Sequence, residues 1–151
     1  MARLILVQGP AGGGKSAAVR AALDAGEVRI VADTTLLWAA IRDRRRGSDG
    51  RYPERDSEAD AADALLAAYV KRTVVRQALG RDLDTAVTTS VAGEEPTYAG
   101  IAHQFGAGFE VRTVDPGEEE VTRRLSRGGR LSDQCRRAIG RWYGGGRRGR
   151  R

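Results

Sequence analysis

The residues best suited to chemistry lie near the N-terminus, in the segment Gly9-Pro10-Ala11-Gly12-Gly13-Gly14-Lys15-Ser16. Its spacing, G-x-x-x-x-G-K-S, is typical of a loop whose backbone N–H groups surround a phosphate. The glycines permit the tight turn, the lysine can reach the β and γ phosphates of a nucleotide, and the serine hydroxyl can bind Mg²⁺. The pattern predicts that residues 9–16 bind ATP or GTP. Lys15 would also act on the transferred phosphate, and Ser16 would hold the metal.

The sequence around this motif favours a functional site over a simple turn. Glycine is common here, at 20 of 151 residues, but of 26 basic residues only Lys15 and Lys71 are lysines. The apolar run 4–7 precedes the motif, and the helix-forming segment 17–23 follows it. A strand, a glycine-rich loop and a helix in this order are what a phosphate site needs, because the helix N-terminus contributes the positive end of its dipole.

Asp33 is the strongest candidate for a general base. It follows the apolar run 28–32 directly, and ligands of a parallel sheet bind beyond the carboxyl ends of its strands. From there Asp33 could accept the proton of an acceptor hydroxyl, or could help Ser16 hold Mg²⁺ through water. The alternative is an N-cap for the next helix, a position that also favours aspartate. One residue could do both.

A second candidate group consists of arginines around the flexible pair Gly128-Gly129: Arg123, Arg124, Arg127 and Arg130. Guanidinium groups on a hinged segment could close over a transferring phosphoryl group and neutralise its charge. The alternative is a solvated helix face, because Glu119 and Glu120 stand four residues before the first two arginines and could pair with them. This leaves Arg127 and Arg130 as the lid candidates with a catalytic role, and Arg123 as a nucleotide-binding candidate.

Alternating strand and helix signals predict an α/β fold. Strands are expected at 3–8, 28–32, 85–91 and 109–114, and helices at 15–25, 34–44, 57–79, 98–104, 117–125 and after Ser132. Strands separated by helices indicate parallel pairing. The helix over 57–79 is expected to turn one apolar set to the core: Ala62, Leu65, Leu66, Tyr69, Val70 and Val74. The last helix is expected to do the same with Cys135, Ala138, Ile139 and Trp142.

Composition limits the classes of protein to consider. A single cysteine, Cys135, and a single histidine, His103, exclude an internal disulfide and a zinc site built from those ligands. The chain has no apolar run long enough for a membrane span and no signal peptide, so we expect a cytoplasmic protein without a membrane partner. Residues 1–143 are expected to form one domain, with 44–56 as a polar loop and 144–151 as a flexible tail rich in glycine and arginine.

The net charge of +6 is concentrated at the C-terminal end of the chain. The last helix and the tail hold seven arginines after Asp133 and no acidic residue. Such an end could bind a nucleic acid through its phosphates, or it could be no more than a solvated terminus.

The motif at 9–16, the aspartate after the second strand and the arginines before the last helix together resemble the small P-loop kinases. This group includes polynucleotide kinase-like, gluconate kinase-like and adenylate kinase-like proteins. The resemblance implies a three-layer P-loop NTPase fold with a short, mostly parallel sheet of about four to five strands. It also implies Mg²⁺-dependent transfer of the γ-phosphate to an unidentified acceptor hydroxyl, with Asp33 positioning or activating that hydroxyl.

The chain departs from this group at its third strand. Many P-loop proteins end that strand with an acidic residue, and this sequence offers Thr88, Thr89 and Ser90. Two alternatives therefore stay open. One is a nucleotide-binding assembly or regulatory protein, of phage or prophage origin, that transfers no phosphate. The other is a nucleic-acid-associated ATPase that uses the basic tail.

Overall fold

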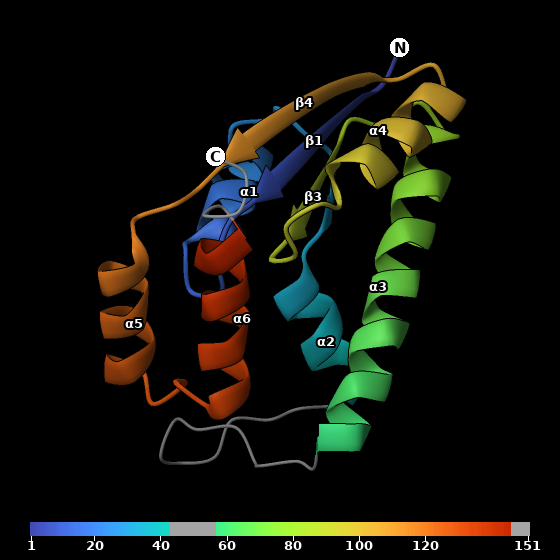
Figure 1. The fold of residues 1–151 in the computed structure, drawn as a ribbon. Coiled ribbons are helices and arrows are strands. Elements are labelled where there is room, and N and C mark those ends of the chain that lie inside the picture. The colour runs from blue at the N-terminus through green and yellow to red at the C-terminus, as the bar shows by residue number, and fades with distance from the viewer. Residues whose placement is uncertain (43–56, 146–151) are drawn as a thin grey trace.

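The computed structural model describes residues 1–42 and 57–145, and Figure 1 shows how their helices and strands are arranged. The predicted polar loop 44–56 lies outside the described residues, as does the basic tail beyond Gly145. The elements follow in the order β1 (Arg3–Gln8), α1 (Lys15–Asp24), β2 (Ile30–Ala32), α2 (Thr34–Arg42), α3 (Ser57–Leu79), β3 (Thr85–Thr89), α4 (Glu95–Gln104), β4 (Gly108–Thr113), α5 (Glu118–Arg127) and α6 (Asp133–Gly145).

Four parallel strands form one sheet in the order β2-β3-β1-β4. β1 is central, and its Leu6 lies opposite Val87 of β3 and Val111 of β4. Each crossover between the strands passes through at least one helix, as the alternating sequence pattern predicts. The described residues therefore confirm an α/β fold with a parallel sheet.

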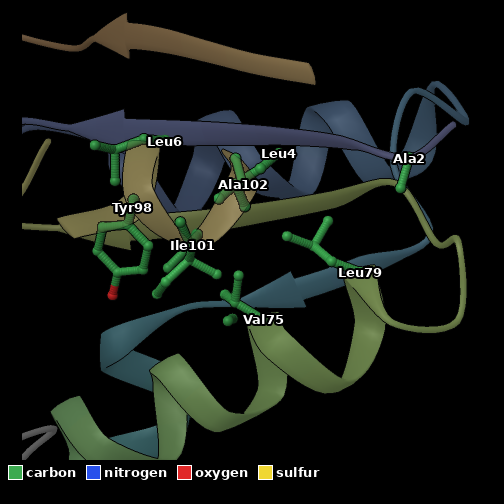
Figure 2. Packing of buried hydrophobic residues seen from close by; sticks show 10 residues of the cluster. Ala2, Leu4, Leu6, Val75, Leu79, Tyr98, Ile101 and Ala102 are labelled. Carbon is green, nitrogen blue, oxygen red and sulfur yellow. The ribbon is translucent and has the colours of Figure 1, made fainter. Parts of the chain in front are cut away.

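Helices cover both faces of this sheet (Figure 1). Ile5 and Val7 of β1 pack with Val19 and Ala22 of α1 on one face. Leu4 and Leu6, which alternate with them, point to the opposite face. There they meet a buried cluster from α3 and α4 that includes Val75, Leu79, Tyr98, Ile101 and Ala102 (Figure 2). Residues 4–7 of β1 are all apolar, as expected of a strand whose two faces are both buried.

α5 and α6 form a small third cluster beside the sheet. Val121 and Leu125 of α5 pack against Ile139 of α6, with Cys135 and Tyr143 partly buried at its border. The Tyr143 hydroxyl donates a hydrogen bond of 2.5 Å to Asp115 Oδ1 in the segment after β4. This bond attaches α6 to the carboxyl end of the sheet.

The N-cap predicted for the last helix is confirmed. Ser132 Oγ accepts a hydrogen bond from the Cys135 backbone N–H at 3.2 Å, as expected of an N-cap. α6 continues to Gly145, two residues beyond the boundary predicted for the domain. α4 begins at Glu95 rather than at residue 98, because Pro96 fits the first turn of a helix, where no backbone donor is needed.

The expected buried face of α3 is wrong at four of its six residues, whereas Val74 packs against the core cluster as expected. Leu65, Leu66 and Tyr69 are 74%, 48% and 67% exposed, and Ala62 is also exposed. The face that meets the sheet instead carries Ala67, Lys71, Val75, Ala78 and Leu79. These residues also repeat at helical spacing, but the set contains a lysine, which a hydrophobicity pattern assigns to solvent.

The second strand is shorter than predicted, because regular pairing begins at Ile30. Val28 is buried ahead of it. In the described part of the chain, no helix combines the length and the apolar character that a membrane crossing requires.

Candidate functional site

The loop between β1 and α1 has a backbone that only glycine allows at two decisive points. Gly14 is the N-cap of α1 and has a φ of 99°, in the left-handed region that side chains disfavour. At Gly9, a Cβ atom would lie 2.2 Å from the carbonyl oxygen of Val114, just after β4. The glycines of the motif therefore keep the loop closed against the sheet. Among the described residues no side chain caps α1, so its first backbone N–H groups are available to an anion.

The Lys15 side chain lies inside this loop, with only 8% of its surface exposed. Its Nζ donates hydrogen bonds to the carbonyl oxygens of Gly9 at 3.0 Å and Pro10 at 2.7 Å. Burial lowers the pKa of Lys15 to about 8; nearby Asp33 partly opposes this shift, and Lys71 adds to it. The buried Lys15 ammonium contacts only the partial charges of two carbonyl groups. A negatively charged ligand would stabilise its charged form more than these carbonyl groups do.

The Asp33 carboxylate lies between two hydroxyl groups. Ser16 Oγ donates to Asp33 Oδ2 at 2.9 Å, and Thr88 Oγ1, from β3, donates to Oδ1 at 2.8 Å. Ser16 belongs to residues 9–16, which we call the phosphate-loop motif because the sequence predicts that they bind phosphate. Asp33 is 2% exposed. Its backbone carbonyl accepts the hydrogen bond of Leu37 at the start of α2, at 3.0 Å. Asp33 therefore occupies the N-cap position of α2, as the N-cap interpretation predicts. Its two carboxylate oxygens accept hydrogen bonds from Ser16 and from Thr88 of β3.

Lys71 of α3 is a residue of this region that sequence reasoning missed. It is 5% exposed, and its Nζ donates to the Thr88 carbonyl oxygen at 2.8 Å and to Thr34 Oγ1 at 3.2 Å. It also forms an ion pair with Glu94 Oε2 at 3.8 Å. Burial is the largest cause of the lowered pKa of Lys71. The scarcity of lysine was the sequence feature that could have indicated Lys71. The charge of Asp33 acts on both lysines of the chain, Lys15 and Lys71.

β3 itself ends in two threonines and no acidic residue. Glu94, five residues later in the chain, places a carboxylate close to that end. Thr89, the last residue of β3, donates its hydroxyl in a short hydrogen bond to Glu94 Oε2. The same oxygen atom is the one paired with Lys71. Lys15, Asp33, Lys71 and Glu94 thus bring two cations and two carboxylates to the carboxyl edge of the sheet, with threonine and serine hydroxyls among them.

The arginines of α5 differ in their surroundings. Glu120 pairs with both Arg123 and Arg124, the latter at 2.6 Å between Nε and Oε1. The expected pair between Glu120 and Arg124 is confirmed, and the one expected between Glu119 and Arg123 is wrong, because Glu120 takes Arg123 at i,i+3 spacing. Arg124 Nη1 also lies 3.8 Å from where a Cβ atom of Gly14 would stand.

The two predicted lid residues sit at the end of α5 and just beyond it. Arg127 is the last residue of the helix, and Arg130 follows the Gly128-Gly129 pair. Both are exposed. α5 packs on the phosphate-loop motif at Gly12. The two are so close there that a Cβ atom at Gly12 would lie 2.8 Å from Leu125 Cγ. Of the α5 arginines, Arg124 is the one placed beside Gly14.

The oxygen atoms near the loop fit a hard cation that also binds phosphate. Ser16 is exposed, and its hydroxyl lies next to the Asp33 carboxylate. The described residues contain no group of three or more acidic, histidine or cysteine side chains arranged around a metal position. Two protein oxygens completed by phosphate and water oxygens is the arrangement that Mg²⁺ prefers.

Comparisons with known proteins relate the fold to solved structures. The sequence matches no protein-family model and no curated protein. Among solved structures, the chain is similar to a "putative kinase" from Chloroflexus aurantiacus J-10-fl, with a TM-score of 0.72 and 11% sequence identity. The match covers 91% of this chain and 74% of the other. At this identity, the likeness concerns the fold alone.

Proposed function

We propose that this protein is a Mg²⁺-dependent phosphotransferase that moves the γ-phosphate of ATP or GTP to an acceptor hydroxyl. The observation that carries the proposal is the hydrogen bond of 2.9 Å between Ser16 Oγ and Asp33 Oδ2. It joins the motif suited to nucleotide phosphates to the buried acid suited to activating an acceptor. The kinase-like fold of the solved neighbour supports the same assignment.

The phosphate-loop motif would bind the β and γ phosphates. The N-terminus of α1 offers uncapped backbone N–H groups, and Lys15 would turn from the carbonyl oxygens of Gly9 and Pro10 to the phosphates. Arg124, beside Gly14, would add a second positive charge. Mg²⁺, held by Ser16 and through water by Asp33, would neutralise charge on the phosphate oxygens when bound.

Asp33 would serve the acceptor. Its carboxylate would take the proton from the acceptor hydroxyl as that oxygen forms its bond to the γ-phosphorus. The bond between the γ-phosphorus and the bridging oxygen breaks in the same transfer, and the nucleoside diphosphate leaves with that electron pair. Thr88 Oγ1 donates to Asp33 Oδ1 at 2.8 Å. The other oxygen, Asp33 Oδ2, accepts its hydrogen bond from Ser16 and is the one that would turn to the acceptor.

The test is transfer of labelled phosphate from γ-labelled ATP and GTP to nucleosides, polynucleotide 5′ ends, sugars and simple alcohols, beside a hydrolysis control without acceptor. Asp33→Asn should lower transfer by about 10²–10⁴-fold, the usual contribution of a general base, and keep nucleotide affinity within a few-fold. Asp24→Asn, an exposed aspartate at the end of α1, is the matched control.

Two outcomes would count against the proposal. If Asp33→Asn transfers phosphate at the wild-type rate, Asp33 only starts a helix. If the wild-type protein binds nucleotide tightly and labels no acceptor of any class, the non-transferring nucleotide-binding alternative gains. That alternative is favoured by the threonines, rather than an acid, at the end of β3.

A further inference from the structure

We infer that the acceptor is an alcohol with a small apolar body, such as an aromatic ring or a short branched chain, rather than a sugar or another polyol. This inference rests on the proposed function, because it names the substrate class of the same site. It comes from a cleft that opens beside Asp33.

The cleft lies between α1 and the junction of β2 with α2. Its volume is about 140 Å³. Two polar groups from the site, Ser16 and Asp33, belong to its lining. Four aliphatic side chains from three elements form its walls: Val19, Leu23, Val31 and Leu36. Arg20 and Thr35 complete the lining.

The size of the cleft limits what it can enclose. A protein cavity of about 150 Å³ lined by aliphatic residues holds one benzene ring. A cleft of about 140 Å³ would therefore take a single ring or a four- to five-carbon branch. Any larger acceptor would extend into solvent past Leu23 and Leu36, whose side chains are 41% and 55% exposed.

The chemistry of the walls limits the acceptor further. Polar atoms that enter a cleft without a hydrogen-bond partner lose their hydration and gain nothing in return. The walls of Val19, Leu23, Val31 and Leu36 offer no such partner, and beyond Ser16 and Asp33 only Arg20 and Thr35 could bond to the several hydroxyls of a sugar. One hydroxyl directed at Asp33 would be satisfied, and the remaining body gains by being apolar.

The nucleotide does not compete for this cleft in the proposed arrangement. The phosphate-loop motif faces α5, through Gly12 against Leu125 and Gly14 beside Arg124. The cleft lies on the other side of Ser16, toward the edge strand β2. An acceptor there and a nucleotide on the loop would meet at Ser16 and Asp33, the two residues that the proposed transfer uses.

The experiment compares acceptors that all carry a primary hydroxyl and differ in the rest of the molecule. Benzyl alcohol and 3-methyl-1-butanol are the apolar probes, and glycerol and glucose are the polar ones; each is tested with wild type, Leu36→Asp and Leu65→Asp. Leu36 belongs to the cleft, whereas Leu65 is an exposed leucine of α3 outside its lining. Binding of each probe is followed by ligand-observed NMR with Mg²⁺ and a non-hydrolysable ATP analogue, and transfer is followed with γ-labelled ATP.

We expect benzyl alcohol to bind and to accept phosphate at least tenfold better than glycerol, measured as kcat/KM for transfer. Leu36→Asp should lower the ratio of kcat/KM for benzyl alcohol to kcat/KM for glycerol at least tenfold. It should leave nucleotide affinity unchanged. Leu65→Asp should behave as wild type. Binding of benzyl alcohol that Leu36→Asp weakens supports the inference even before transfer is measured.

The inference and the proposed function can fail separately. Equal transfer to glycerol and benzyl alcohol, insensitive to Leu36→Asp, overturns the apolar acceptor and keeps the phosphotransferase. Absence of benzyl alcohol binding to the nucleotide-loaded wild type also overturns the inference. Specific binding of benzyl alcohol without transfer to any probe supports the cleft and counts against the phosphotransferase.

Discussion

The depressed pKa of Lys15 would make the affinity for the proposed nucleotide depend on pH in a defined direction. The Lys15 ammonium is buried against two carbonyl oxygens, and its pKa is lowered to about 8. A bound polyphosphate would restore the charged form, because an opposite charge at contact distance raises the pKa of an amine. Below pH 8 most Lys15 side chains already carry the positive charge that the phosphates would contact. Above pH 8 most are neutral, and binding would require Lys15 to take up a proton.

The size of the effect follows from this titration. With a free-protein pKa of about 8 and a bound form in which Lys15 stays charged, affinity should fall about tenfold from pH 7 to pH 9. Binding should take up about half a proton at pH 8 and nearly one at pH 9. The terminal phosphate of the nucleotide is ionised over most of this range and cannot produce a loss of this sign.

Isothermal titration calorimetry in pairs of buffers with different ionisation enthalpies measures both quantities. The matched variant is Lys15→Arg, whose guanidinium stays charged across the range. It should show weaker binding with little dependence on pH. The other titratable groups that act on Lys15 are Asp33 and Lys71, so Lys71→Arg serves to test whether the slope belongs to Lys15. A flat affinity between pH 7 and pH 9 with no proton uptake by the wild type would refute the reasoning.

The remaining predictions concern the scaffold and the charges around the loop. Gly9→Ala should lower the free energy of unfolding by about 2–4 kcal/mol, because its new Cβ would meet the Val114 carbonyl oxygen at 2.2 Å; urea denaturation measures the loss. Lys71→Met should lower it by about 2–4 kcal/mol, because it leaves the Glu94 carboxylate without its buried cation; thermal and urea unfolding measure the change. Arg124→Gln should weaken nucleotide binding several-fold with little effect on folding, because the side chain is partly exposed beside Gly14; calorimetry measures the affinity.

Each of these has a control in the same chain. Gly100→Ala, inside α4 with open space around it, should stabilise by up to about 1 kcal/mol. Arg72→Met, next to Lys71 but exposed, should change stability by less than about 0.5 kcal/mol. Arg141→Gln, an exposed arginine of α6, should leave nucleotide affinity as it is. A Gly9→Ala protein as stable as wild type, or an Arg124→Gln protein with unchanged affinity, would contradict the corresponding expectation.

The sequence alone determined the order of the elements and the place of the phosphate-loop motif. Both are local properties. The apolar run of β1 and the Gly and Lys spacing of residues 9–16 are read within a dozen residues. The position of Asp33 after β2 also followed from the chain, because parallel strands end at one edge of a sheet.

Only the tertiary structure decided which residues surround that edge. Lys71 is distant in sequence from Asp33 and Thr88, and nothing local indicates that α3 turns this lysine inward in place of Leu65 and Tyr69. The ion pair of Lys71 with Glu94, and the approach of Arg124 to Gly14 across more than a hundred residues, are further examples. The rotation of a helix about its axis depends on the surface it packs against, and that surface exists only after the sheet has formed.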